Sequence, residues 1–341
     1  MIAKHMLKLG LTLIGAVALA SVASAQTVNW QVHNLLSKSV WEVQCNQWLA
    51  DEMAKETGGK FKMNIYPGGS SGIKGADILG AVSDNLVQHA MMWGSHVAGE
   101  EKIMELFDLP LFVPKDHEFR VKLWKALEPD FRAMLKDRYN VYLWRIGQES
   151  PRMIYTKKPV KTLADMKGMK IRAMGPVETA FTQAIGAQPV PVAWTETYTA
   201  LQQGMVDGNW VADLPQFDAK LYEVTNYIVD IGNAGAGNMS ITSIKALDSL
   251  PGDYRQKLLS HQDEYFKCNA DGSYAGTSKG RELLTTKGGM KVAAISAKDR
   301  AFMIAQAKPI VDAWQKDLDA ESRRIFEKAK AMIDEHNAKN M

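Results

Sequence analysis

Residues 150–175 read SPRMIYTKKPVKTLADMKGMKIRAMG. The apolar residues of MIYT and MKIRAM predict two strands, with a short helix or turn at LADMKG between them. Arg152 precedes the first strand and Arg172 lies near the end of the second. An arginine at the carboxyl end of a strand can hold a carboxylate through two parallel hydrogen bonds. Spacing alone equally allows a surface position for Arg172, and for Arg152 taken by itself it favours the surface. The stretch is therefore a candidate anion-binding site, and a surface position of the two arginines is the alternative.

The order of elements on either side of this stretch predicts two α/β lobes. Alternating apolar residues predict strands at 28–32, 61–65 and 90–93, separated by helices, one of which ends near Glu56. Further strands are expected at 140–147, 187–192 and 225–232, with helices at 176–186 and 195–204. Long amphipathic runs predict helices at about 253–285 and 298–336. The expected fold class is α/β, with two lobes, long C-terminal helices and a ligand crevice at the strand ends.

The first 25 residues predict a cleaved secretory leader. A short basic start precedes the apolar run 9–22, and Ala23-Ser24-Ala25 forms a small-residue cleavage site. The remaining 316 of the 341 residues are more than one core usually holds, which favours two lobes. Without Lys4 and Lys8 the net charge falls from +3 to +1, which argues against nucleic acid as a partner.

The cysteine pair is Cys45 and Cys268. An oxidising compartment would permit a disulfide between them. Cys45, however, falls on a helical stripe with Trp41, Leu49 and Met53, which is typical of a buried thiol. Two separate core thiols are the preferred interpretation, with a disulfide as the alternative.

Catalytic motifs are not recognisable in the chain. The seven histidines are scattered and none lies in an HExxH motif, and no serine is interpreted as the nucleophile elbow of a G-x-S-x-G motif. GNAGAG at 232–237 lacks the context of a phosphate loop and is interpreted as a crossover between lobes. No cofactor and no metal is expected.

Tryptophans divide into core and crevice candidates. Trp194 lies in a turn before a helix and Trp210 after a glycine-rich turn, positions that favour a place in the crevice. Trp93 ends an expected strand. Core packing is the preferred interpretation for a second set, Trp30, Trp41, Trp48 and Trp144.

Several motifs, in order along residues 28–330, resemble those of the periplasmic solute-binding proteins of TRAP transporters, the DctP-type family. These motifs are ETGGK (56–60), DLPLF (108–112), KTLADMKGMKIR (161–172), YTALQQGMVDG (198–208) and LP (250–251). Each is weak alone, and together they are specific. The resemblance implies a clamp that closes on an organic acid, with Arg172 making the paired contact to the carboxylate and Arg152 supporting it.

The same resemblance implies further ligand contacts. Trp194 would pack on the ligand, and the other lobe would contribute the end of the first strand at His33-Asn34 and the stretch 90–95 with Trp93. The remaining candidates are Tyr198, in the matching motif YTALQQGMVDG, and three residues in segments where the motifs diverge: Asn209, Trp210 and Lys74.

Two departures from the family pattern affect the ligand class. Many relatives read D-G-x-E-N where this chain has Asp207-Gly208-Asn209-Trp210-Val211, so that valine replaces a ligand-binding asparagine. Ile73-Lys74 stands where many relatives carry a Glu-Arg pair. Both changes put the common dicarboxylates in doubt.

These observations predict periplasmic capture of a small monocarboxylate (hydroxylated, branched or aromatic) and its delivery to a TRAP permease. The expected lobes are 26–149 with about 238–278, and 150–237 with about 279–341, joined near 147–151 and 235–239, where Gly147, Gly235 and Gly237 could bend. A monomer is expected. The alternatives are a C4-dicarboxylate or sugar-acid binder, a sensor adaptor for a receptor, and a secreted isomerase or lyase with Glu196 as its base.

Overall fold

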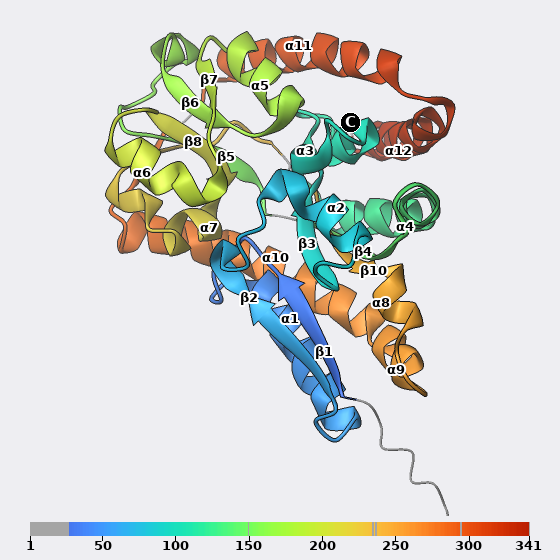
Figure 1. Cartoon of the computed structure of the whole chain (residues 1–341). Coiled ribbons are helices and arrows are strands. Elements are labelled where there is room, and N and C mark those ends of the chain that lie inside the picture. The colour runs from blue at the N-terminus through green and yellow to red at the C-terminus, as the bar shows by residue number, and fades with distance from the viewer. Residues whose placement is uncertain (1–26, 149, 234, 236, 294, 341) are drawn as a thin grey trace, which may run out of the picture.

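Two mixed β-sheets frame the part of the chain that the computed structural model describes, residues 27–340 without 149, 234, 236 and 294 (Figure 1). The expected leader, 1–25, lies outside the described residues. The first sheet has the order β2-β1-β3-β10-β4. Its strands are β1 (Val28–His33), β2 (Phe61–Tyr66), β3 (His89–Trp93), β4 (Val141–Gln148) and β10 (Gly237–Ser243).

The second sheet has the order β11-β9-β5-β8-β6-β7. Its strands are β5 (Arg152–Thr156), β6 (Lys170–Ala173), β7 (Gln188–Pro191), β8 (Gly208–Ala212), β9 (Tyr227–Val229) and β11 (Lys291–Ala293). In the first sheet β1 is parallel to β2 and β3, and in the second β6 is parallel to β7 and β8. The carboxyl ends of these parallel strands meet where the two lobes face each other.

Helices cover the faces of both sheets. They are α1 (Trp41–Glu56), α2 (Ile78–Ser83), α3 (Gly94–Val97), α4 (His117–Tyr139), α5 (Gly175–Ala184), α6 (Thr197–Gln202), α7 (Asp213–Asp218), α8 (Ile244–Asp248), α9 (Tyr254–Ser260), α10 (Gln262–Thr286), α11 (Ala297–Trp314) and α12 (Ala320–Lys339). Short 3-10 helices include η2 (Gly75–Asp77), η3 (Lys102–Asp108) and η5 (Trp194–Glu196). Local signals set the ends of α4: the Asp116 side chain caps its start, and Asn140 ends it in the left-handed conformation at φ 54°.

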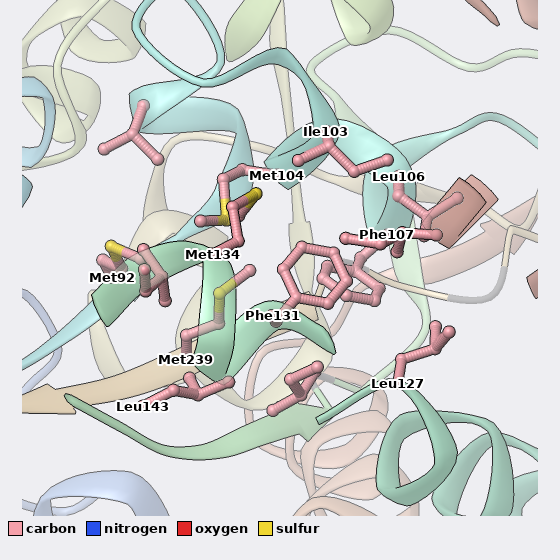
Figure 2. Close-up of a cluster of buried hydrophobic side chains, with 14 of the residues drawn as sticks. Met92, Ile103, Met104, Leu106, Phe107, Leu127, Phe131, Met134, Leu143 and Met239 are labelled. Atoms are coloured by element: carbon pink, nitrogen blue, oxygen red, sulfur yellow. The ribbon is translucent and has the colours of Figure 1, made fainter. Parts of the chain in front are cut away.

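The largest core lies under the first sheet. Phe107 and Phe131 pack there with ring centres 5.2 Å apart, among methionines and leucines of β3, β10 and α4 (Figure 2). Phe326 and Ile333 of α12 complete this core. The last helix therefore packs on α4 of the first lobe, whereas the sequence-based boundary placed 279–341 with the second.

Helix α10 runs along both lobes, packing on α1 of the first and α7 of the second (Figure 1). Glycines on α10 allow this close approach. A Cβ at Gly272 would lie 2.5 Å from the Cβ of Trp41, and one at Gly280 would lie 2.5 Å from the backbone nitrogen of Leu214. The small side chains along one face of α10 thus allow this helix to pack closely against both lobes.

Two strand connections also join the lobes, from β4 to β5 and from β9 to β10. Gly147 and Gly237, expected as bending points, lie inside the paired strands β4 and β10. A Cβ at Gly237 would lie 2.4 Å from that of Phe107, so glycine is needed there for close packing. Gly235, with φ 98°, is the one of the three in a conformation that favours glycine.

Cys45 and Cys268 form a disulfide, which corrects the preferred interpretation of two separate thiols. Their Cα atoms are 6.0 Å apart because α1 and α10 lie side by side. This separation is within the range that a disulfide spans. The buried stripe on α1 was recognised from the sequence, but the helix that faces it lies 223 residues further along the chain.

Within the described ranges, none of the helices combines the length and the apolar character that crossing a membrane requires.

Candidate functional site

A partly open pocket, with about 340 Å³ of empty space that includes space open to solvent, lies between the lobes at the carboxyl ends of their parallel strands. The first lobe contributes residues that follow β1 and β3, and the second contributes residues of β5, β6, β8 and η5. The lining is Leu35, Leu36, Trp93, His96, Arg152, Arg172, Met174, Trp194 and Val211. We call this cavity the inner chamber.

A wider cavity of about 1340 Å³, the outer chamber, adjoins the inner chamber. The two share Leu35, His96, Arg172, Met174 and Trp194 in their walls. The outer chamber adds the loop around Lys74 and the stretch 191–195. A ligand in the inner chamber would therefore contact both lobes.

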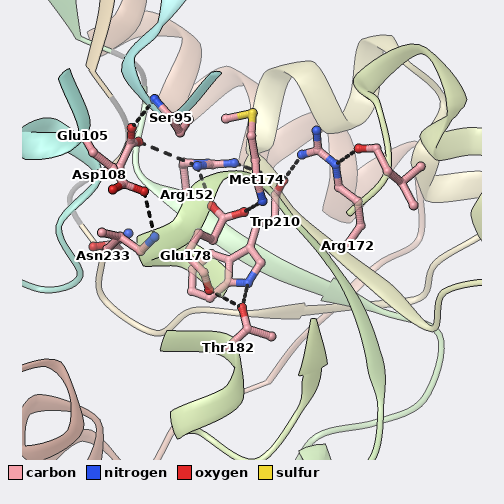
Figure 3. Close-up of polar contacts among 12 residues, drawn as sticks. Ser95, Glu105, Asp108, Arg152, Arg172, Met174, Glu178, Thr182, Trp210 and Asn233 are labelled. Carbon is pink, nitrogen blue, oxygen red and sulfur yellow. Dashed lines mark hydrogen bonds and ion pairs between the residues drawn. The ribbon is translucent and has the colours of Figure 1, made fainter. Parts of the chain in front are cut away.

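Arg172 is 2% exposed, lies on β6 and is one of the residues that line both chambers. Its Nε donates to the carbonyl of Val192 at 3.0 Å, and Nη1 approaches the carbonyl of Trp210 at 3.5 Å (Figure 3). The ring of Trp194 lies 5.8 Å from the guanidinium carbon, within cation–π distance. These contacts fix the plane of a buried cation beside a cavity.

Arg152 is buried in a network of acids. Its Nη1 lies 2.5 Å from the Glu178 carboxylate on α5 and 3.9 Å from that of Asp108 on η3 (Figure 3). Asp108 also accepts a hydrogen bond from the backbone N–H of Ser95 at 3.0 Å. Because Asp108 belongs to the first lobe and Arg152 to the second, this network ties the lobes together beside the inner chamber.

Other expected site residues also line cavities. Trp93 lies in the wall of the inner chamber, Trp194 in that of both chambers, and the exposed Lys74 in that of the outer one. Tyr198 lines a neighbouring cavity of about 690 Å³ that shares Leu35 and Trp194, and its hydroxyl donates to Glu223 at 2.8 Å.

Asn34 and Asn209 are fully buried and hold the backbone near the site. The Asn34 side chain accepts a hydrogen bond from the N–H of Leu36 at 2.9 Å, which shapes the turn after β1. The Asn209 amide donates to the side chain of Gln216 at 3.0 Å. The contact of Asn34 positions the turn that carries Leu35, and the contact of Asn209 positions the start of β8. Neither asparagine is among the residues that line the inner chamber.

Trp210 does not line the inner chamber, which corrects the expectation from its position after a glycine-rich turn. Residues 208–212 form the strand β8, so the side chains of Trp210 and Val211 point to opposite faces. Trp210 is 1% exposed in the core of the second lobe, where its indole donates to Thr182 at 2.9 Å (Figure 3). Val211 and the carbonyl of Trp210 face the site instead.

Several lining residues were missed from the sequence: Leu35, Leu36, His96, Met174 and Val211. Each lies within two residues of a segment that was singled out, or was noted only as a departure from the family pattern. Extending the candidate segment His33-Asn34 by two residues would have found Leu35 and Leu36, and Met174 already lay in the expected strand MKIRAM. Among the described residues, no group of three or more His, Cys, Asp or Glu side chains is arranged to hold a metal ion.

Burial and charge shift three pKa values around the site. Burial together with Arg172 and Arg152 lowers the pKa of His96 to about 3, and burial lowers that of His33 to about 4. Burial raises the pKa of Glu105 to about 7. Both histidines are therefore neutral at neutral pH.

Two lobes closing on a buried arginine define the class of two-lobed ligand-binding proteins. The chain belongs to the DctP family of bacterial extracellular solute-binding proteins, family 7, whose model matches residues 32–317. Proteins of this family are extracytoplasmic binding components of TRAP transporters for small organic acids and are not enzymes. The resemblance seen in the motifs is confirmed, and the isomerase or lyase alternative is set aside.

Three similar proteins illustrate the ligands of the family. The 2,3-diketo-L-gulonate-binding periplasmic protein YiaO of Escherichia coli is 26% identical over 275 residues, 79% of this chain and 81% of its own length. The C4-dicarboxylate-binding periplasmic protein DctP of Vibrio cholerae is 26% identical over 277 residues, covering 80% and 82%. The crystal structure of DctP6 of Bordetella pertussis, a receptor binding pyroglutamic acid, superposes with a TM-score of 0.82 at 25% identity and covers 89% of this chain and 100% of its own.

Proposed function

We propose that the protein captures a small monocarboxylate whose carboxylate is gripped by Arg172. The observation that carries this proposal is the position of Arg172, buried at 2% exposure in the wall of the inner chamber. The low dielectric around a buried arginine strengthens a charge-assisted bidentate contact. The ring of Trp194 and the carbonyl of Val192 both contact the Arg172 guanidinium and hold its plane in one orientation.

The apolar lining supports a ligand with one charge. The apolar residues Leu35, Leu36 and Val211 line the inner chamber together with Arg172. A second carboxylate placed against these side chains would lose its hydration without a partner, at a cost of several kcal/mol. A hydroxylated, branched or ring-shaped body would fill the same space favourably. Pyroglutamate and 2,3-diketo-L-gulonate, named for two similar proteins, each carry a single carboxylate.

A C4-dicarboxylate or sugar acid is the second candidate. The exposed Lys74 in the outer chamber is a cation that could meet a second carboxylate in a longer ligand. The Vibrio cholerae relative is named for such ligands.

Delivery of the ligand to a TRAP permease by a monomeric, exported protein completes the proposal. Cleavage after Ala25 would release residues 26–341 as the mature chain. A role as a sensor adaptor would use the same cleft with a different partner.

Native mass spectrometry of the purified protein, followed by a thermal-shift screen of monocarboxylates and dicarboxylates, tests the ligand class. A co-purified or strongly stabilising monocarboxylate is the expected result. A C4-dicarboxylate as the tightest ligand would contradict the proposal and favour the second candidate.

A further inference from the structure

His96 lies on α3, directly after β3, and belongs to the walls of both chambers. Its ring contacts the edge of Trp93, with ring centres 5.9 Å apart. Arg172 and Trp194 line the same two chambers from the second lobe. A ligand held by Arg172 would therefore have the imidazole of His96 as a polar neighbour from the first lobe.

The ring of His96 is positioned by close packing. Its Nδ1 is buried and has no hydrogen-bond partner within the part of the chain that the structure describes. Gly75 of η2 lies against it, and a Cβ there would come within 2.4 Å of Nδ1 and 2.6 Å of Cε1. Gly75 is not among the glycines with positive φ, so its backbone would accept alanine. The glycine thus makes room for the imidazole.

The charge state of the ring suits an uncharged ligand group. Burial and the two arginines hold the pKa of His96 near 3. A neutral imidazole has one donor and one acceptor nitrogen. It can pair with a hydroxyl, a ketone or an amide, whereas the neutral ring itself offers no positive charge to a second carboxylate.

We propose that His96 is a specificity-determining residue whose imidazole hydrogen-bonds an uncharged polar group of the ligand, such as a hydroxyl, ketone or ring amide. The inference rests on the proposed function, in which Arg172 holds the carboxylate. It narrows the ligand to an acid that carries such a group within the span of the inner chamber.

Three pairs of probes test this role, because the two members of each pair differ by one uncharged polar group. They are pyroglutamate against cyclopentanecarboxylate, 2-hydroxyisovalerate against isovalerate, and malate against succinate. Dissociation constants are measured by calorimetry for the wild type, His96→Leu, His96→Gln and Gly75→Ala. Gly80→Ala is the matched control, because a Cβ at Gly80 meets nothing within 4 Å.

In the wild type, we expect the polar member of at least one pair to bind about tenfold tighter or more, since a site built for a hydrogen bond rejects the analogue that lacks it. His96→Leu and Gly75→Ala should reduce that ratio below about threefold by weakening the polar member alone, while His96→Gln retains most of it. The Gly80→Ala ratio should equal that of the wild type. A wild type without any such preference, or variants that weaken both members equally, would overturn the role of His96.

The two proposals fail separately. If malate and succinate are the tightest probes and their ratio collapses in His96→Leu, the role of His96 stands and the monocarboxylate proposal falls. If a monocarboxylate binds tightest and its ratio is unchanged in His96→Leu and Gly75→Ala, the proposed function stands and the role of His96 falls.

Discussion

The guanidinium of Arg152 lies 2.5 Å from the carboxylate of Glu178, and both side chains are less than a tenth exposed. Asp108 of the other lobe lies 3.9 Å from the same guanidinium. Arg172, twenty residues further along the chain, instead contacts two backbone carbonyls and the Trp194 ring. We propose that the two arginines have different roles: Arg152, beside two carboxylates, holds the lobes in place, and Arg172 contacts the ligand.

Arg152→Ala should lower the free energy of unfolding by about 3–5 kcal/mol, because it leaves the carboxylate of Glu178 buried without its partner. The double variant Arg152→Met/Glu178→Gln should lose less. Urea unfolding of the ligand-free protein measures both. Arg255→Ala is the control, since its pair with Asp248 is about half exposed. A loss no larger for Arg152→Ala than for this control would contradict the assigned role.

The positions of Trp194 and Trp210 predict opposite phenotypes. Trp194→Ala should weaken ligand binding about tenfold, because it removes the wall beside the Arg172 guanidinium. Trp210→Phe should leave binding within about threefold and reduce stability by about 1–3 kcal/mol, because the buried Thr182 hydroxyl loses its donor. Calorimetry and urea unfolding of each variant separate the two effects. The reverse pattern would show that Trp210 belongs to the cleft after all.

Glu105 predicts a pH-dependent stability. Its carboxylate accepts a hydrogen bond from the backbone N–H of Val177 at 2.7 Å, and burial raises its pKa to about 7. Because the folded state binds this proton more tightly than the unfolded state, the stabilisation is present below about pH 4.5 and is lost as the pH rises through 7. The full effect is about 3 kcal/mol, from roughly 1.4 kcal/mol for each pKa unit.

Glu105→Gln removes this titration. The difference in unfolding free energy between wild type and variant should change by about 2–3 kcal/mol between pH 5 and pH 8. Taking the difference cancels the opposite contribution of His96 and His33, whose lowered pKa values destabilise the fold as the pH falls. Parallel curves for the two proteins would show that Glu105 titrates normally.

The Cys45–Cys268 disulfide joins α1 and α10 across most of the sequence. Replacing both cysteines by serine should lower the free energy of unfolding by about 2–5 kcal/mol, because the unfolded chain gains freedom. Ligand affinity should stay within about threefold, since neither residue lines the chambers. Two free thiols titrated in the denatured, unreduced protein would contradict the pairing.

Local sequence patterns were sufficient where a contact lies within one element. Alternation predicted β1 and β2 to within a residue, and the apolar runs predicted β3. The strand-end position of Arg172 left a surface place open, and the resemblance to the family favoured the cleft, whose wall Arg172 lines. Val211 entered only as a departure from the family pattern, yet it faces the site.

Contacts set by tertiary packing could not be predicted from the sequence. Trp210 was placed only as following a glycine-rich turn, and no strand was expected at 208–212, so there was no basis for assigning opposite faces to Trp210 and Val211. The disulfide depends on α1 meeting α10. His96 depends on the room left by Gly75, which no local pattern shows.

Calorimetric titration of Arg172→Lys with the acid identified by native mass spectrometry tests the central claim most directly. Lysine keeps the charge but lacks the planar fork, so affinity should fall at least about thirtyfold, the lower end of the loss for a buried charge pair. Arg255→Lys, at an exposed site, controls for the substitution itself. Affinity of Arg172→Lys within about threefold of wild type, a difference under ~0.7 kcal/mol, would contradict the account.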